Sequence, residues 1–307
     1  GSYSRLKTWD QTEKKINIKK DDCPKLKSAE NVEIVIQMHW AECIMRIERI
    51  QCSKYPSVIV KQPERDLIFR REYPHKDNNE PFHFENAYEF IDENGEWYLD
   101  REEKLLYYKP DNTQDITNIE VIAPRVETLL KIQGTLDEPV HDLRFVGLCF
   151  MHSTWLRPSC KGQIASQATQ YNLENTTGDE QYIGRPPAAV YVAAAHDIKF
   201  ERNIFKNLGA TALDLHYGAS DNSIIGNVFY DISGNGISLA KFADPEVEHH
   251  TAYNPKDKRE ICRNNLISNN VITRVGQDYY GDIGIVCGSA QSVTIEHNEI
   301  FKLPFGG

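Results

Sequence analysis

The chain has 307 residues, a formal net charge of -10 at pH 7, a pI of about 5.5 and 40% apolar residues. This acidic balance argues against nucleic acid and anionic membrane surfaces as partners, because both attract basic patches. The sequence has no run of about 18 apolar residues, so we expect no membrane span. The charge also suits a neutral glycan better than a polyanionic one, unless a cation bridges the two.

The first part of the chain predicts short strands without a clear repeat. We expect residues 1–30 to form an N-terminal segment, and residues 31–125 to form the first coils of a solenoid around an insertion at about residues 62–117. Inside this insertion, the run from Glu93 to Asp100 and the run from Leu105 to Tyr108 predict a β-hairpin, because apolar and aromatic residues flank a charged turn.

The seven cysteines contain no CxxC pair, so we predict no zinc site and no other metal site. A full disulfide framework is not expected, and the pattern leaves room for one isolated bridge. Cys149 and Cys287 lie inside apolar runs and are interpreted as small buried hydrophobic residues.

An internal repeat in residues 126–307 predicts the fold, an all-β, right-handed parallel β-helix with loop and hairpin insertions. Each repeat has an Asn after a short β-rich run, then a turn and a second strand; these residues are Asn203, Asn227, Asn270 and Asn298. Periods in the twenties without a helical pattern are typical of β-solenoids. We expect the Asn residues to form a structural ladder, and Leu213, Ile237 and Ile285 to stack in the interior.

Strand alternation gives this predicted solenoid an outward face. If Leu213 and Leu215 point inward, Asp214 and His216 point outward, with small residues on the neighbouring coils. Asp282 is expected at the edge of the same face, two coils along. Asp214 and Asp282 would then be about 10 Å apart between backbones, near the spacing of the two carboxylates in an inverting glycosidase. We therefore select Asp214, Asp282 and His216 as candidate catalytic residues, whereas Glu296 is a weaker candidate.

Other side chains near this face could bind a sugar, through ring stacking or hydrogen bonds to hydroxyl groups. The residues chosen for this role are Tyr191, Tyr217, Ser238, Lys241, His249 and Tyr280. His249 belongs to a charged insertion at residues 242–260, and long polar loops on a rigid scaffold are common places for function.

Two segments resemble bacterial β-helix proteins that act on carbohydrates. The first runs from Asn86 through Trp97 to Tyr108, and the second is Ile295–Ile300 with Leu303–Gly307. The sequence resembles glycoside hydrolase family 141 and, more distantly, family 120. This resemblance implies a secreted or periplasmic bacterial glycosidase that acts on plant cell-wall glycans through acids on the outer face of the helix. It also implies that further coils of the same protein follow residue 307 and contribute to the site.

Three functions remain open from the sequence. The first is a glycoside hydrolase with paired carboxylates, acting on an oligo- or polysaccharide without a cofactor. The second is a polysaccharide lyase on the same fold, which could use Ca²⁺ to neutralise a uronate. The third is a solenoid that binds glycans without catalysis, because function depends on sites and not on folds.

Overall fold

The computed structural model describes residues 3–39, 41–70, 76–165, 170–175, 180–242 and 244–307. The chain forms two compact units. The first comprises Gly1–Ile122 with Arg157–Ile164, and the second comprises Ala123–Leu156 with Ala165–Gly307. None of the helices in these described ranges is long and apolar enough to cross a membrane.

The first unit contains an antiparallel sheet in the order β1-β7-β4-β5-β6-β3-β2, with β14 paired to β5. Its strands are β1 (Ser4–Arg5), β2 (Thr8–Asp10), β3 (Lys15–Asn17), β4 (Glu33–Gln37), β5 (Glu42–Gln51), β6 (Ser57–Val60), β7 (Pro81–Glu85) and β14 (Gln163–Ile164). Its helical elements are η1 (Lys20–Asp22), α1 (Glu64–Arg70), η2 (Tyr88–Phe90), η3 (Ile116–Asn118) and α2 (Arg157–Lys161). A disulfide joins Cys23 to Cys52, which matches the single bridge that the sequence allowed.

The prediction that solenoid coils begin near residue 31 is wrong. Strands β4, β5 and β6 pair with antiparallel neighbours, not with parallel coils. An apolar strand that alternates its side chains looks the same in both arrangements, and only a repeat distinguishes them. The predicted hairpin is confirmed, since β8 (Trp97–Asp100) pairs antiparallel with β9 (Leu105–Tyr108).

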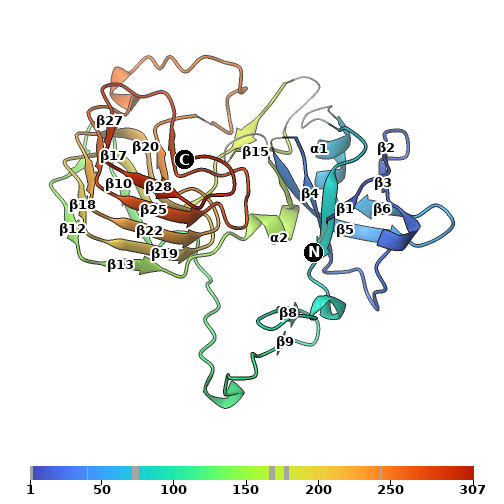
Figure 1. Ribbon diagram of the computed structural model, residues 1–307. Helices are drawn as coiled ribbons and strands as arrows, with labels where there is room; N and C mark the ends of the chain where they lie inside the picture. The colour runs from blue at the N-terminus through green and yellow to red at the C-terminus, as the bar shows by residue number, and fades with distance from the viewer. Residues whose placement is uncertain (1–2, 40, 71–75, 166–169, 176–179, 243) are drawn as a thin grey trace. The chain divides into compact units, whose positions relative to one another are not determined.

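The second unit is the predicted right-handed parallel β-helix, with three parallel sheets whose coils follow one another in Figure 1. The first sheet contains β10 (Leu130–Gln133), β11 (Val140–His141), β17 (Ala188–His196), β20 (Thr211–Ser220), β23 (Ile237–Leu239) and β26 (Ile285–Cys287). The second contains β12 (Arg144–Val146), β18 (Lys199–Glu201), β21 (Ser223–Ile225), β24 (Leu266–Ser268) and β27 (Thr294–Glu296). The third contains β13 (Cys149–Met151), β19 (Ile204–Leu208), β22 (Val228–Ile232), β25 (Val271–Val275) and β28 (Glu299–Phe301). Outside these sheets lie β15 (Tyr171–Asn172), β16 (Ile183–Gly184) and η4 (Lys258–Glu260).

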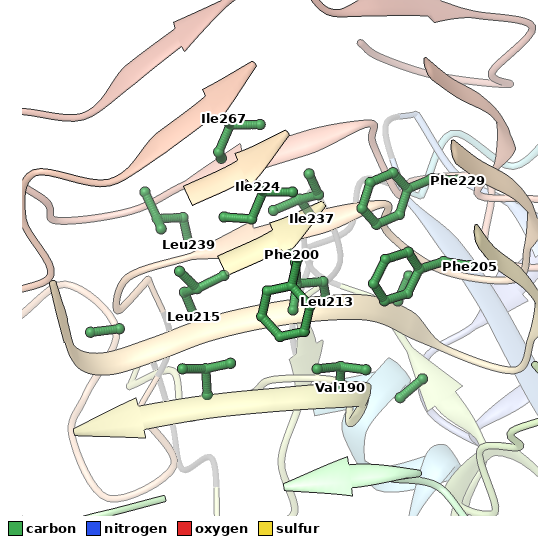
Figure 2. Packing of buried hydrophobic residues seen from close by; sticks show 14 of the residues in the cluster. Val190, Phe200, Phe205, Leu213, Leu215, Ile224, Phe229, Ile237, Leu239 and Ile267 are labelled. Atoms are coloured by element: carbon green, nitrogen blue, oxygen red, sulfur yellow. The ribbon is translucent and has the colours of Figure 1, made fainter. Parts of the chain in front are cut away.

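The core of the solenoid consists of aligned apolar side chains. Leu213 lies opposite Ile237, and Ile237 lies opposite Ile285, as the repeat predicts. Figure 2 shows the stack of Val190, Leu213 and Ile237 beside the stacked rings of Phe205 and Phe229. Those two rings are 4.6 Å apart and nearly parallel. This fully buried interior fixes the register of the outward residues on the same strands. Cys149 and Cys287 were both predicted to be buried in the interior. That prediction is wrong, because both are exposed.

The predicted Asn ladder is confirmed at the turn before the third sheet. The side-chain oxygen of Asn227 accepts hydrogen bonds from both the backbone N–H and the side-chain amide of Asn203, at 2.9 and 3.0 Å. Asn270 and Asn298 repeat this pattern on the next coils. A second ladder joins Asn222 to Asn265 at the turn before the second sheet. The ladders satisfy buried backbone groups that would otherwise lack partners.

Candidate functional site

The candidate site lies on the outer face of the first solenoid sheet. Tyr191 on β17, Asp214 on β20 and Ser238 on β23 occupy one register position on successive coils. Asp214 and Ser238 are only 2% and 1% exposed, respectively. Other parts of the chain therefore cover most of both side chains, and Ser238 lines neither of the two pockets described below.

Asp214 forms a buried ion pair with Arg185, which follows β16. The Nε atom of Arg185 donates to one carboxylate oxygen at 2.7 Å, and its Nη2 atom donates to the other. The Nη1 atom of Arg185 donates to the carbonyl of Ala240 at 2.6 Å, and the guanidinium lies 3.9 Å from the ring centre of Phe242. Since the guanidinium engages both oxygens of Asp214, the pair is balanced in charge and rigid in geometry.

His216 lies beside this pair at an irregularity in the strand. The register between β17 and β20 shifts after Val192, so that Ala193 pairs with Tyr217 and His216 has no opposite residue. Its Nδ1 atom is 2.9 Å from the hydroxyl of Tyr191. Burial and the nearby Arg185 lower the pKa of His216 to about 4. The imidazole is therefore neutral at pH 7, when it can donate one hydrogen bond and accept another.

A pocket of 350 Å³ opens above these residues. Apolar and aromatic groups form part of its wall, including Tyr171, Pro187 and Tyr191. Its polar groups include Lys131, Arg185, Asp214 and His216. The structure thus brings three of the predicted residues, Tyr191, Asp214 and His216, into one concave site. Small-molecule sites typically combine apolar walls with a few convergent polar groups.

A second pocket, of 380 Å³, is lined by Lys241, Asp244, Glu248, His249 and Glu260, among others. The ammonium of Lys241 lies 3.0 Å from the carboxylate of Asp244. It also lies 5.4 Å from the ring centre of Tyr217 and 5.5 Å from that of Tyr253. Burial raises the pKa of the Asp244 carboxyl group. Hydrogen bonds from Lys241 and from the backbone N–H of Glu246 lower this pKa by more, so the net shift is downward.

The remaining predicted sugar-binding side chains are His249, which lines this second pocket, and Tyr217 and Tyr280, which do not. Burial, together with the adjacent His250, lowers the pKa of His249, whose backbone N–H donates to Gln181 at 2.7 Å. Tyr217 lines neither pocket, but its ring contacts the ammonium of Lys241. Tyr280 is 38% exposed and lines neither pocket.

Asp282 does not join Asp214 in the pocket. Its side chain is 2% exposed and lies beside the backbone of Gly234, where an added Cβ atom would come within 2.9 Å of its Oδ2 atom. Asp214 lies opposite Ser238 on β23, whereas Gly234 lies in the bend before that strand. Asp282 likewise precedes β26 and does not line the pocket that contains Asp214. The prediction that the two carboxylates share one site is therefore corrected, because Asp282 is not at an outward position on a strand.

Sequence reasoning missed several residues of these two pockets, among them Lys131, Tyr171, Arg185, Asp244 and Glu260. Arg185 lies between β16 and β17, and nothing in its local sequence indicates that it faces Asp214. Within the described ranges, no group of three or more His, Cys, Asp and Glu side chains is arranged to hold a metal ion.

Comparisons with known proteins agree with the resemblance stated above. Residues 1–111 match the family model of the GH141 insertion domain, and residues 166–307 match that of the right-handed β-helix region. A solved structure named a glycoside hydrolase is 32% identical in sequence, with a TM-score of 0.91 over 99% of this chain. The chain spans 56% of the length of that protein. A comparison with curated protein sequences finds no match.

Proposed function

We propose that this chain carries the glycan-binding face of a glycoside hydrolase, on the outer surface of the first solenoid sheet. The observation that carries the proposal is the 350 Å³ pocket in which Tyr191, Asp214 and His216 converge. Likeness to a glycoside hydrolase over 99% of the chain supports it further. The Cys23–Cys52 bridge is consistent with an oxidising compartment, so we propose a secreted or periplasmic location.

The pocket chemistry suits a neutral sugar. Rings such as Tyr171 and Tyr191 offer apolar surface to the C–H groups of a pyranose. The neutral imidazole of His216 and the ammonium of Lys131 offer hydrogen bonds to its hydroxyl groups. Arg185 cancels the charge of Asp214, so the pocket floor does not require a charged ligand.

The proposed mechanism uses two carboxylates, one as general acid and the other as base or nucleophile. Asp214 is the candidate for the base or nucleophile, because its carboxylate lines the pocket and is held in place by Arg185. The neighbouring pocket supplies further carboxylates for the acid role. Lys241 pairs with Asp244 and His250 contacts Glu248, whereas Glu260 accepts a hydrogen bond from the neutral Tyr253 at 3.4 Å. We therefore propose Glu260 as the acid to test first.

The test is turnover of neutral plant cell-wall oligosaccharides, namely xylo-oligosaccharides and fucosylated xyloglucan fragments, followed as new reducing ends. We expect turnover by the 307-residue chain and its loss in Asp214→Asn and Glu260→Gln, with sugar binding retained, at temperatures where circular dichroism shows both variants to be folded. Glu299→Gln changes an exposed acid on another sheet and serves as the control. Unchanged turnover in Asp214→Asn would remove that residue from the mechanism. An unsaturated uronate product would indicate a lyase, and binding without any turnover would indicate a non-catalytic solenoid.

A further inference from the structure

We propose that the first unit carries a second carbohydrate-binding site, separate from the solenoid, at a cluster of three tyrosines. The cluster consists of Tyr88 at the start of η2, Tyr98 on β8 and Tyr107 on β9. It shares a ligand class with the proposed function but uses none of the same residues.

The β8–β9 hairpin positions two of these rings. Tyr98 and Tyr107 are opposite residues of the antiparallel pair, so both side chains are on one face of the hairpin. Their ring centres are 6.4 Å apart and the planes differ by 25°. Tyr88 presents its ring edge-on to both, with centres 4.9 Å from Tyr107 and 6.5 Å from Tyr98. The three rings therefore form a fixed aromatic corner.

This corner forms one wall of a pocket of 330 Å³. Its polar groups are Lys27, Ser28, Asn31, Asn86, Glu89 and Asp100. The amide of Asn31 donates to the hydroxyl of Tyr98 at 3.3 Å, and the ammonium of Lys27 lies 5.7 Å from the ring centre of Tyr88. Aromatic and polar groups therefore reach the same space from different segments of the chain.

A neutral oligosaccharide is the ligand that this chemistry fits. A pyranose ring has an apolar face of C–H groups that packs on an aromatic ring, and hydroxyl groups that need both donors and acceptors. Lys27 and Asn31 supply donors, and Glu89 and Asp100 supply acceptors. The two carboxylates disfavour a phosphate or another polyanion. Tyr88 is 48% exposed and thus remains available to a ligand.

The hairpin also provides its own control. Trp97 and Tyr108 pair on the opposite face, and Trp97 is 63% exposed but does not line the pocket. A Trp97→Ala substitution therefore removes an exposed aromatic ring from the same strand without changing the proposed site.

The experiment is affinity electrophoresis of the full chain in native gels that contain arabinoxylan, xyloglucan or galactan. We expect at least one of them to retard the protein, and we expect Tyr88→Ala and Tyr98→Ala to weaken the affinity about tenfold. Trp97→Ala and Glu299→Gln should behave as wild type, and circular dichroism checks the fold of every variant. A further variant, Asn31→Ala, removes the amide that donates to the hydroxyl of Tyr98 and leaves all three tyrosine rings in the chain.

Three results would overturn the proposal. They are retardation equal to wild type in both tyrosine variants, loss of retardation in Trp97→Ala, and no retardation of the wild type in any of the gels. Failure of the hydrolase proposal gives a different pattern, because turnover is then absent while retardation still depends on Tyr88 and Tyr98.

Discussion

At the scale of single residues, the Arg185–Asp214 pair has the largest energetic consequence in the candidate site. Their side chains are 8% and 3% exposed. A buried charge is costly without its partner, because water no longer solvates it. Arg185 also packs on Phe242 and donates to the carbonyl of Ala240. The pair therefore holds the segment before β17 against β20 and the chain beyond β23.

We predict that Arg185→Met destabilises the chain by about 3–5 kcal/mol, because it leaves the Asp214 carboxylate buried and unpaired. Urea unfolding provides the measurement. The matched control is Arg144→Met, which breaks the exposed pair with Glu201 and should have little effect. Adding Asp214→Leu to Arg185→Met should recover part of the loss. Similar midpoints for the two single variants would contradict a buried ion pair at this place.

His216 should make stability depend on pH. Its pKa is lowered from 6.5 to about 4, mainly by burial, with Arg185 and Lys241 adding to the effect and Asp214 and Asp244 opposing it. Between these values the unfolded chain binds a proton that the folded chain does not. The contribution of His216 to the free energy of unfolding is therefore complete above pH 6.5 and is lost as the pH falls towards 4. The Tm of His216→Gln should fall less than that of wild type over this range. A ring that titrates near pH 6.5 by NMR would refute the prediction.

The sequence predicted the outward position of Asp214 and His216 because alternation along a strand fixes it. It did not predict Arg185, whose contact with Asp214 joins residues 29 positions apart. The error at Asp282 has a similar origin. Asp282 precedes its strand, so the alternation of side chains along a strand does not determine its direction. The conformation of the preceding turn determines it instead.

At the scale of elements, the Asn ladder stabilises the turns between the second and third sheets. Asn227 is 1% exposed, accepts from Asn203 and donates to both the carbonyl of Phe200 and the side chain of Asn270. Each amide thus connects its own coil to the coils on both sides. Removing the side-chain amide of Asn227 takes this partner from the backbone N–H and side-chain amide of Asn203 and from the carbonyl of Phe200, all on the preceding coil.

We predict that Asn227→Ala costs about 2–4 kcal/mol of stability, since several buried polar groups lose their partner at once. Thermal unfolding of the variant against wild type measures the effect. Asn254→Ala is the control, because Asn254 is exposed and its side chain accepts a hydrogen bond from the ammonium of Lys258 at 2.7 Å. Equal Tm values for the two variants would show that the ladder does not stabilise the coils.

The repeat made the solenoid predictable, because Asn203, Asn227, Asn270 and Asn298 mark equivalent turns with apolar strands at fixed offsets. The first unit has no such period. Its strands β4 and β5 carry the same apolar alternation as solenoid strands, so the sequence could not distinguish an antiparallel sheet from further coils. The β8–β9 hairpin was predictable because its turn and both of its arms are local in sequence.

At the scale of the whole molecule, the two units differ in how the chain is constrained. The solenoid has one continuous core of aligned apolar side chains. The first unit has the Cys23–Cys52 bridge, which closes a segment of 29 residues. Such a bridge reduces the number of conformations that the unfolded chain can adopt, and the stabilisation grows slowly with the length of the closed loop.

Reduction should therefore destabilise the first unit selectively. The chain-entropy relation gives about 3–4 kcal/mol for a loop of this length. We predict that Cys23→Ser with Cys52→Ser, or treatment of wild type with dithiothreitol, speeds amide hydrogen exchange in β4, β5 and β6. Strands β20 and β22 carry no disulfide and should exchange as before, which provides an internal control. The free Cys262 is fully buried in the solenoid, so Cys262→Ala controls for the loss of a cysteine as such. Equal acceleration in both units would mean that the bridge does not act locally, and no acceleration in β4 to β6 would mean that it contributes nothing to the sheet.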